Sequence, residues 1–423
     1  MNITIKKNQD FSEVLKKGGK ALIIRIIGFI SGYLFMYYTI KFFGPETQGR
    51  LNLSFSFMMI GALICRLGLD IHFVKIFSID GNHLNSKGIY FRTIPFVFGL
   101  TVIASSIVFA LSDQISSVFF NDQQLSVYLK WTAPCIIFFT FVLLNASVFR
   151  GLKKNSLYSF LFNGGRFAFT LAVFFLFIQI KEEPIVTVIA HTIAVFILLL
   201  ISIGYIHKYN FPYSKKSTYF TGKFILQSLP MLISTSMIVF LGWTDTIILG
   251  IFKTTSDVGV YGVILKIAVV TSFTFQALDS ILAPKLSYAY HNKDMTGFKK
   301  LINYSTILNS VVSLIIVMLI IFFRNWILSM FGEEFSKAST ALIILCIGQL
   351  FNAVCGPVGS ILQMTGRQII FQNILIVGFV LNVILNLLLA PTYGITGVAT
   401  STAISLATWN VLSVLYIKKT IFN

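Results

Sequence analysis

Five basic residues stand inside long apolar runs of this sequence, where a charge is costly: Arg25, Arg66, Lys130, Arg166 and Lys266. A charged side chain in hydrocarbon costs roughly 2.5–3.5 kcal/mol on insertion scales, so it normally faces water or a partner. Arginine can hold a phosphate with a bidentate fork, and lysine acts as a mobile point charge. The five cations therefore suggest anion binding. The alternative is that they tie helices together or extend to an interface, which applies most to Arg66 and Lys130.

One acidic residue in these runs, Asp245, could form an ion pair with one of the basic residues, Lys266. Asp245 and Lys266 each lie seven residues from the same expected edge of their runs. At 1.5 Å per residue both lie at the same depth, about 10 Å down. An ion pair between them is one prediction, and Lys266 as a substrate ligand is the other.

Asp279 and His191 complete the set of titratable groups in these runs that could bind and release a proton. Asp279 is thirteen residues from Lys266, which puts the two on roughly opposite faces of one helix. An isolated buried carboxylate can carry a proton, so Asp279 and Asp245 are candidates for ion coupling. His191 is a further candidate, although a lone histidine in such a run more often donates a packing hydrogen bond.

The elements that must position these residues are apolar helices. The chain has 423 residues, 56% hydrophobic and only 11% charged, with a formal net charge of +18. A bilayer-crossing helix needs roughly 20 mostly apolar residues, and the runs do not alternate as barrel strands would. We predict an all-α integral membrane protein with twelve spans: 20–42, 50–69, 92–112, 124–149, 155–180, 184–206, 224–252, 259–285, 301–323, 338–362, 368–390 and 394–417.

Basic residues gather in alternate connections between these spans. They are dense before residue 20, in the long connections 70–91 and 207–223, and around 285–300, and sparse in the intervening loops. This is the positive-inside pattern, and an even number of spans puts both termini in the cytoplasm. No basic patch lies on a soluble domain, so a nucleic-acid partner is not expected.

The chain divides into two similar halves. We expect a cytoplasmic segment 1–19, an N-lobe 20–206, a cytoplasmic linker 207–223, a C-lobe 224–417 and a tail 418–423. Gly49 and Gly262 are 213 residues apart, and Gly151 and Gly366 are 215 apart, each pair in a similar local sequence. Two pairs at nearly one offset suggest a parallel internal repeat, with substrate bound between the halves. Chance is the competing explanation, since glycine is common at helix ends.

No motif indicates an enzyme or a bound cofactor. Phosphate loops, nucleophile elbows and cofactor fingerprints do not occur. The four cysteines lie inside spans without histidine at zinc-site spacing. We therefore expect no catalytic residue, no metal and no cofactor.

Several local sequences resemble a known family of exporters. They are GPETQGRLNLSFSF (44–57), FRGLKKN (149–155), DVGVYGVILKIA (257–268), LQMTGRQ (362–368) and YGITGVATSTAIS (393–405). Together they are similar to the polysaccharide branch of the multidrug/oligosaccharidyl-lipid/polysaccharide (MOP) exporter superfamily, and most of all to its Wzx-type flippases. The related lipid II flippases usually carry fourteen spans rather than twelve.

This resemblance implies a fold and a function. The fold is MATE-like, with two six-helix lobes around a central cavity. The function is transfer of an undecaprenyl-diphosphate-linked oligosaccharide repeat unit, for O-antigen of lipopolysaccharide or for capsule, across the bacterial inner membrane to the periplasmic leaflet by alternating access. The cations at several depths would then hold the diphosphate and sugar. Implied partners are membrane lipids, a proton or sodium counter-ion, the repeat-unit polymerase and the chain-length regulator.

Two other functions remain as alternatives. A proton- or sodium-coupled drug or cation exporter of the MATE type would need an acidic or aromatic cavity, whereas the charges buried here are mainly positive. A membrane repeat-unit polymerase would need a large outer loop with catalytic residues. The longest expected outer loop, about 324–337, is too short for that.

Overall fold

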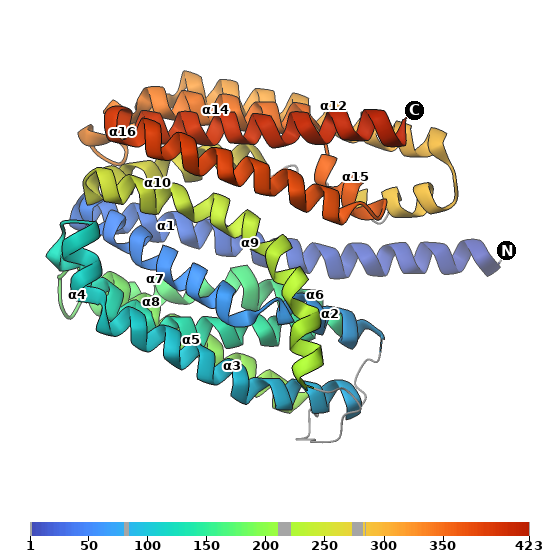
Figure 1. Ribbon diagram of the computed structural model, residues 1–423, viewed down its shortest axis with the longest axis horizontal. Helices are drawn as coiled ribbons and strands as arrows, with labels where there is room; N and C mark the ends of the chain where they lie inside the picture. The colour runs from blue at the N-terminus through green and yellow to red at the C-terminus, as the bar shows by residue number, and fades with distance from the viewer. Residues whose placement is uncertain (1, 80–83, 210–220, 273–281, 284, 423) are drawn as a thin grey trace. The chain divides into compact units, whose positions relative to one another are not determined.

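The chain is built from apolar helices. The computed structural model describes residues 2–79, 84–209, 221–272, 282–283 and 285–422. Within these residues every long element is a helix, and nine helices are long and apolar enough to cross a membrane (Figure 1). The expected all-α membrane fold is thus confirmed. The count of twelve spans stays a prediction.

Two of the long helices each contain two of the predicted spans. α1 (Asn2–Arg66) is two helices joined at Gly44, whose φ is 78°, with Pro45 following. α16 (Gln368–Ile421) is likewise two helices joined at Gly394, whose φ is 53°. Glycine accepts this left-handed backbone without strain, and proline suits the first turn of the next helix. A glycine thus separates the spans in each pair.

The chain folds into two compact units, which differ from the expected lobes. Unit 1 comprises Met1–Phe43 and Ser54–Ser236, and unit 2 comprises Gly44–Leu53 and Met237–Asn423. The division falls inside α9 (Thr221–Phe252). The first part of α9 belongs to unit 1 because the Ser228 hydroxyl donates to the Leu67 carbonyl (2.7 Å) and Phe224 stacks on His72. Most of the expected linker, 210–220, lies outside the described residues, and the lobe limits stay a prediction.

Unit 1 is organised around α5, its most enclosed long helix. α5 packs against α2, α3 and α8, and α7 packs against α8. A polar chain joins three of these helices, because the Tyr90 hydroxyl donates to Asn145 (2.5 Å) and Asn145 donates to Ser202 (2.8 Å). Such interhelical hydrogen bonds stabilise membrane bundles. Besides the first and last parts of α1 and the first part of α9, the elements of this unit are α2 (Leu69–Ile79), α3 (Leu84–Ala110), α4 (Ser112–Gln114), the π-helix η1 (Ile115–Phe119), α5 (Gln123–Gly151), α6 (Asn155–Ser159), the π-helix η2 (Phe160–Gly164), α7 (Gly165–Ile178) and α8 (Val186–Lys208).

One of the connections expected in unit 1 is partly helical. The second predicted span, 50–69, ends at Arg66 because Leu67 and Gly68 adopt positive φ. A new helix, α2, then occupies part of the connection expected at 70–91. It forms because Phe73 and Phe77 are buried and α2 packs along α5.

Unit 2 is organised around α14 (Ser339–Val354), which packs against α10, α12 and α16. These helices run alongside one another in Figure 1. A capping box between Thr254 and Asp257 starts α10 (Thr255–Val269). Asp294 caps α12 (Met295–Phe322) by accepting from the Gly297 amide. The remaining described elements are η3 (Val270–Ser272), a helix over 285–291, α13 (Arg324–Ser329), η4 (Glu333–Ala338) and α15 (Val358–Met364).

Two of the motifs that suggested an internal repeat contact each other in unit 2. A Cβ at Gly49 would collide with the carbonyl of Thr255, and a Cβ at Gly259 would collide with that of Pro45. The Asn52 amide donates to the Val258 carbonyl (3.5 Å). Residues 44–53 thus pack backbone to backbone on α10, which explains why they belong to unit 2.

Candidate functional site

Arg166 follows a π-helical turn inside a membrane-length helix. α6, η2 and α7 form one continuous segment, Asn155–Ile178, and η2 interrupts it just before Arg166. A π turn inserts a residue into the α-helical hydrogen-bond ladder and is frequent at functional sites. Here Gly164 and Gly165 are buried, whereas Asn163 is exposed. The backbone irregularity therefore coincides with the charge that stood out in the sequence.

Small residues bring α1 directly against this turn. A Cβ at Gly28 would lie 2.6 Å from the Cα of Gly164, and a Cβ at Gly164 would lie 2.5 Å from Ile24. One turn before Gly28, the Arg25 Nε donates to the Ser159 hydroxyl (3.3 Å). Arg25 and Arg166 thus belong to two adjoining elements of unit 1.

The guanidinium of Arg166 is half-buried and contacts uncharged groups. Its Nη1 lies 3.8 Å from the Met59 sulfur, and its central carbon lies 4.4 Å from the Phe167 ring centroid and 5.1 Å from that of Phe139. Among the described residues, neither Arg166 nor Arg25 has a carboxylate within ion-pair distance. Rings and sulfur hold the guanidinium plane but leave most of its N–H donors unused. Such an arrangement can accept an anion.

Arg66 and Lys130 have their charges matched by carboxylates. The Arg66 Nη1 lies 2.7 Å from Asp70, and its Nε donates to the Ala62 carbonyl (3.0 Å). The Lys130 ammonium lies 2.9 Å from both oxygens of Asp113. Hydrogen bonds from Ser126 and Lys130 lower the pKa of Asp113. The sequence could have indicated Asp70, which is only four residues beyond Arg66, although the two lie on different helices, α1 and α2. It could not have indicated Asp113, seventeen residues before Lys130.

Asp245 is buried in unit 2 among neutral donors. Its Oδ2 accepts from the hydroxyls of Tyr261 (2.8 Å) and Thr402 (2.5 Å), and its Oδ1 accepts from the Asn386 amide (2.6 Å). The predicted Asp245–Lys266 ion pair is wrong, because Tyr261 is the α10 residue that reaches the carboxylate. Lys266 lies five residues further on, about 140° around the helix. Two side chains at the same depth on neighbouring helices need not point toward each other.

The groups around this carboxylate form an oxygen-rich set, which we name the Asp245 cluster: Asp245, Tyr261, Asn382, Asn386 and Thr402. Asn386 also donates to the Asn382 oxygen (3.1 Å), and its own side-chain oxygen is buried with no hydrogen-bond partner among the described residues. Oxygen ligands suit small hard cations, and a carboxyl in such a set can also hold a proton. Asn386 of α16 thus hydrogen-bonds a residue of another helix, Asp245 of α9.

His191 is linked to the backbone of Arg166 through the Thr170 hydroxyl. Its ring is fully buried, lies 4.2 Å from the Phe55 ring, and has Nδ1 at 3.2 Å from the Thr170 hydroxyl. That hydroxyl donates to the Arg166 carbonyl (2.7 Å), so Nδ1 is the donor in the histidine contact. Of the other predicted site residues, Lys266 is half-buried on α10, and Asp279 lies outside the described residues.

Comparison with known proteins now identifies the family. A family model described as "Polysaccharide biosynthesis protein" matches residues 14–287. The chain belongs to this family. A second model, MatE, matches residues 230–388. The predicted membership of the polysaccharide branch of the MOP superfamily is thereby confirmed.

Curated relatives come from archaea and from a bacterium. The probable low-salt glycan biosynthesis flippase Agl15 of Haloferax volcanii is 30% identical over 184 residues, which are 42% of this chain and 38% of that protein. The uncharacterized membrane protein MJ1375 of Methanocaldococcus jannaschii is 24% identical and matches 90% of this chain and 84% of its own length. The capsular polysaccharide biosynthesis protein CapF of Staphylococcus aureus is 26% identical over 35% of this chain and 37% of its own length. The chain thus spans about two fifths of the length of Agl15 and of CapF.

Solved structures show the same fold at low sequence identity. The lipid II flippase MurJ in an inward closed conformation has a TM-score of 0.75 at 15% identity, covering 96% of this chain and 88% of MurJ. An inward-facing multidrug resistance MATE family transporter has a TM-score of 0.72 at 14% identity, covering 95% and 98%. The chain therefore has the MATE-like fold that the resemblance implied and is a multi-pass membrane protein.

Proposed function

We propose that this protein is a flippase that moves an undecaprenyl-diphosphate-linked oligosaccharide repeat unit, for O-antigen or capsule, from the cytoplasmic to the periplasmic leaflet. The observation that carries the proposal is the guanidinium of Arg166, which lies inside a membrane-length helix without a carboxylate among the described residues. Supporting it are the family membership and the relatives named as flippases of glycan biosynthesis.

The substrate explains why an unmatched cation would be retained in the membrane. A lipid diphosphate must carry two phosphates through a region of low dielectric constant while its polyprenyl tail stays in lipid. A guanidinium can form paired, charge-assisted hydrogen bonds with phosphate, and these are stronger where water is excluded. Arg166 already stacks on Phe167 and Phe139, so it loses little freedom when an anion binds. Arg25, on the adjoining α1, supplies a second donor group.

The five predicted cations divide by role in this proposal. Arg25 and Arg166 hold the diphosphate. Arg66 and Lys130 would contribute to substrate binding only if they exchanged Asp70 and Asp113 for phosphate. Lys266 is assigned to the sugar or phosphate from its place in the sequence alone.

The driving force in this proposal is a proton or sodium ion bound at the Asp245 cluster. The buried carboxylate, two hydroxyls and two amides provide the oxygen atoms that either ion needs. His191 and Asp279 are further candidates for a proton. Alternating access, both termini in the cytoplasm, and work beside the repeat-unit polymerase and chain-length regulator complete the proposal for a bacterial inner membrane.

A drug or cation exporter of the MATE type is the second candidate. It is favoured by the MatE match to residues 230–388, which contain the buried carboxylate of Asp245. A cationic drug would be repelled by Arg166, whereas a diphosphate would be attracted. The two candidates therefore differ in what neutralising Arg166 should do.

The test is export in cells carrying Arg166→Gln, with Arg166→Lys and Arg150→Gln alongside. Arg150 also stacks on an aromatic ring, Tyr158 at 5.2 Å, but it is exposed at the end of α5, so it is a matched control. At normal protein levels we expect Arg166→Gln to lower surface polysaccharide at least tenfold and to accumulate lipid-linked repeat units facing the cytoplasm. Arg166→Lys should be intermediate and Arg150→Gln unchanged. Unchanged export in Arg166→Gln would reject the proposal, and raised drug efflux would favour the exporter.

A further inference from the structure

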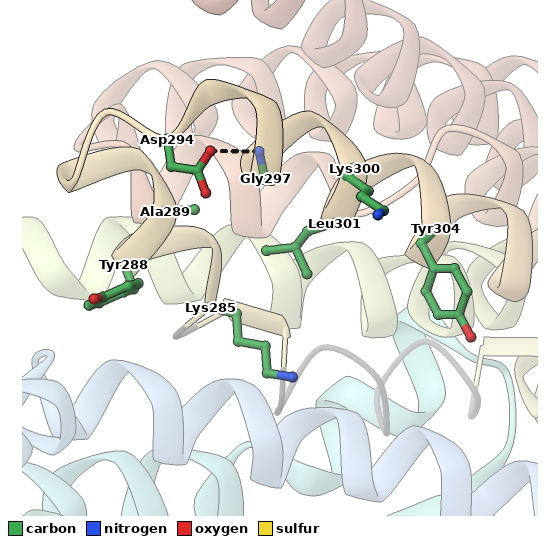
Figure 2. A pocket seen from close by; sticks show the side chains of 8 residues that line it. All are labelled: Lys285, Tyr288, Ala289, Asp294, Gly297, Lys300, Leu301 and Tyr304. Carbon is green, nitrogen blue, oxygen red and sulfur yellow. Dashed lines mark hydrogen bonds between the residues drawn. The ribbon is translucent and has the colours of Figure 1, made fainter. Parts of the chain in front are cut away.

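A pocket of about 650 Å³ lies at the N-terminal end of α12 in unit 2. Its walls come from the helix over 285–291, from Asp294 and from the start of α12, and it shares no lining residue with the Asp245 cluster. Figure 2 shows the residues that line it: Lys285, Tyr288, Ala289, Asp294, Gly297, Lys300, Leu301 and Tyr304. We refer to it as the α12 pocket.

Two lysines and one aspartate give this pocket a net positive charge. Lys285 and Lys300 reach it from different helices, and both are exposed. In the part of the chain that the structure describes, neither forms an ion pair. The carboxylate that lines the pocket, Asp294, is engaged as the cap of α12, where it accepts from the Gly297 amide (2.8 Å). The two ammonium groups are thus available for phosphate.

Two tyrosines give the pocket aromatic ends. Tyr288 is 75% exposed and Tyr304 is 71% exposed, so most of each ring is uncovered. In Figure 2 the two rings lie at opposite ends of the pocket, with Lys285, Leu301 and Lys300 between them. Exposed rings beside a polar group suit the apolar face of a sugar and its hydroxyls. The volume exceeds what a phosphate alone would fill, which favours a ligand with a sugar attached.

An apolar stripe leads away from the pocket along α12. It starts at Tyr304 and continues at helical spacing through residues that are all exposed: Ile307, Val311, Ile315, Met318 and Phe322. An exposed stripe of this length on a membrane-length helix faces lipid. A soluble anion would use the lysines only, whereas a lipid phosphate would use the lysines and the stripe together.

The pocket is supported by a packed core and by the chain's C-terminal end. Leu286, Ala289 and Phe298 belong to a buried cluster that includes Ile417 and Ile421 of α16. The positive-inside pattern places this end of unit 2 in the cytoplasm, where the substrate of a flippase starts.

We infer that the α12 pocket is a loading site, in which Lys285 and Lys300 bind the diphosphate of the lipid-linked oligosaccharide, Tyr288 and Tyr304 stack on its first sugar, and the polyprenyl tail lies along α12. This inference rests on the proposed function. It adds a binding step before the substrate reaches Arg166.

The test is ligand binding to the full-length protein in nanodiscs of phosphatidylcholine. The probe is undecaprenyl diphosphate carrying one N-acetylglucosamine, with phosphatidylglycerol and inorganic diphosphate as comparison ligands. The variants are Lys285→Gln with Lys300→Gln, the corresponding double arginine variant, and Lys299→Gln. Lys299 is the matched control because it lies next to Lys300 on α12 but stacks on Phe422 at 5.2 Å, outside the pocket.

We expect the double glutamine variant to bind the probe about tenfold more weakly, with the double arginine variant and Lys299→Gln close to wild type. Tyr288→Ala should weaken binding of the sugar-bearing probe and leave binding of undecaprenyl diphosphate without the sugar unchanged. Equal binding by wild type and the double glutamine variant would overturn the loading site while leaving the proposed function intact. The loading site would also be overturned if Lys299→Gln weakened binding of the probe as much as the double glutamine variant does. The same holds if the double glutamine variant lost phosphatidylglycerol binding to the same extent as probe binding. If the wild type itself does not bind the probe, both proposals fail.

Discussion

Unit 1 and unit 2 each hold a charged side chain, Arg166 and Asp245, that has no opposite charge within ion-pair distance among the described residues, and the two surroundings differ. In unit 1 the Arg166 guanidinium is held by two phenylalanine rings and a methionine sulfur. In unit 2 the Asp245 carboxylate accepts hydrogen bonds from Tyr261, Asn386 and Thr402. In the described part of the chain most N–H donors of the cation have no acceptor, whereas both oxygens of the anion accept hydrogen bonds.

This difference indicates what each site can bind. Unused guanidinium donors are satisfied best by an incoming anion with several oxygens, such as a phosphate. A carboxylate surrounded by donors and by other oxygens can take up a proton or a small metal ion. The two sites therefore suit a substrate and a coupling ion respectively.

The largest expected effect comes from giving Arg166 a counter-ion. Met59→Glu would place a carboxylate beside Nη1, where the methionine sulfur now lies 3.8 Å away. The resulting ion pair should occupy the donors and lower export roughly tenfold to a hundredfold, although the arginine is still present. Met59→Gln, of the same length but neutral, should keep most activity. Equal export by Met59→Glu and Met59→Gln, at equal protein levels, would show that Arg166 does not need to be free.

The next effect concerns the coupling ion. Asp245→Asn keeps the size of the side chain but removes its charge, so transport should fall about tenfold and should no longer respond to the proton or sodium gradient. Uptake of the substrate into vesicles, with and without each gradient, measures this. Asp257→Asn, in the capping box at the start of α10, is the control for replacing a carboxylate by an amide. Retention of gradient dependence in Asp245→Asn would assign coupling elsewhere, with His191 the next candidate.

A smaller effect concerns stability alone. Tyr261→Phe removes the hydroxyl that donates to Asp245, so the free energy of unfolding should fall by about 1–2 kcal/mol. A lower melting temperature in detergent would report this loss. Tyr205→Phe is the control, because in the described chain the Tyr205 hydroxyl makes no hydrogen bond and its ring packs on Phe149. Equal melting temperatures for the two variants would mean that the Tyr261 hydrogen bond does not stabilise the cluster.

The smallest effect is a pH dependence at the Lys130–Asp113 pair. Since hydrogen bonding lowers the pKa of Asp113, its ionised form stabilises the fold above the unfolded-state pKa, and this contribution is lost as the pH falls through the folded-state pKa. Asp113→Asn should flatten the acid side of the curve of melting temperature against pH by about one or two degrees. The effect is small because the Asp113 side chain is 67% exposed and the Lys130 side chain 37% exposed, so solvent screens the pair. An unchanged curve would show that the pair does not contribute.

The sequence predicted the fold well because the signals for it are local. Apolar runs such as 124–149 and 184–206 correspond closely to α5 and α8. The turn at Gly44 and Pro45 was recognisable because those two residue types favour a break between helices. The end of the second span and the helix α2 were missed, since they depend on burial of Phe73 and Phe77 against another helix.

The candidate site was predictable only in part. A charge in an apolar run is conspicuous, so Arg25 and Arg166 were identified without a structure. Their surroundings were not, because helix packing decides them. Thr402 lies 157 residues from Asp245, and no spacing rule connects the two. The pairing of Asp245 with Lys266 failed because sequence gives the depth of a residue more reliably than the direction its helix presents to a neighbour.

The central claim is that Arg166 binds the diphosphate of the substrate, and paired binding measurements test it most directly. The affinities of wild type and Arg166→Gln are measured for undecaprenyl diphosphate and undecaprenyl monophosphate, each with the same sugar, in nanodiscs of phosphatidylcholine. We predict that wild type prefers the diphosphate about tenfold or more and that Arg166→Gln loses most of this preference. The same preference in both proteins would contradict the claim.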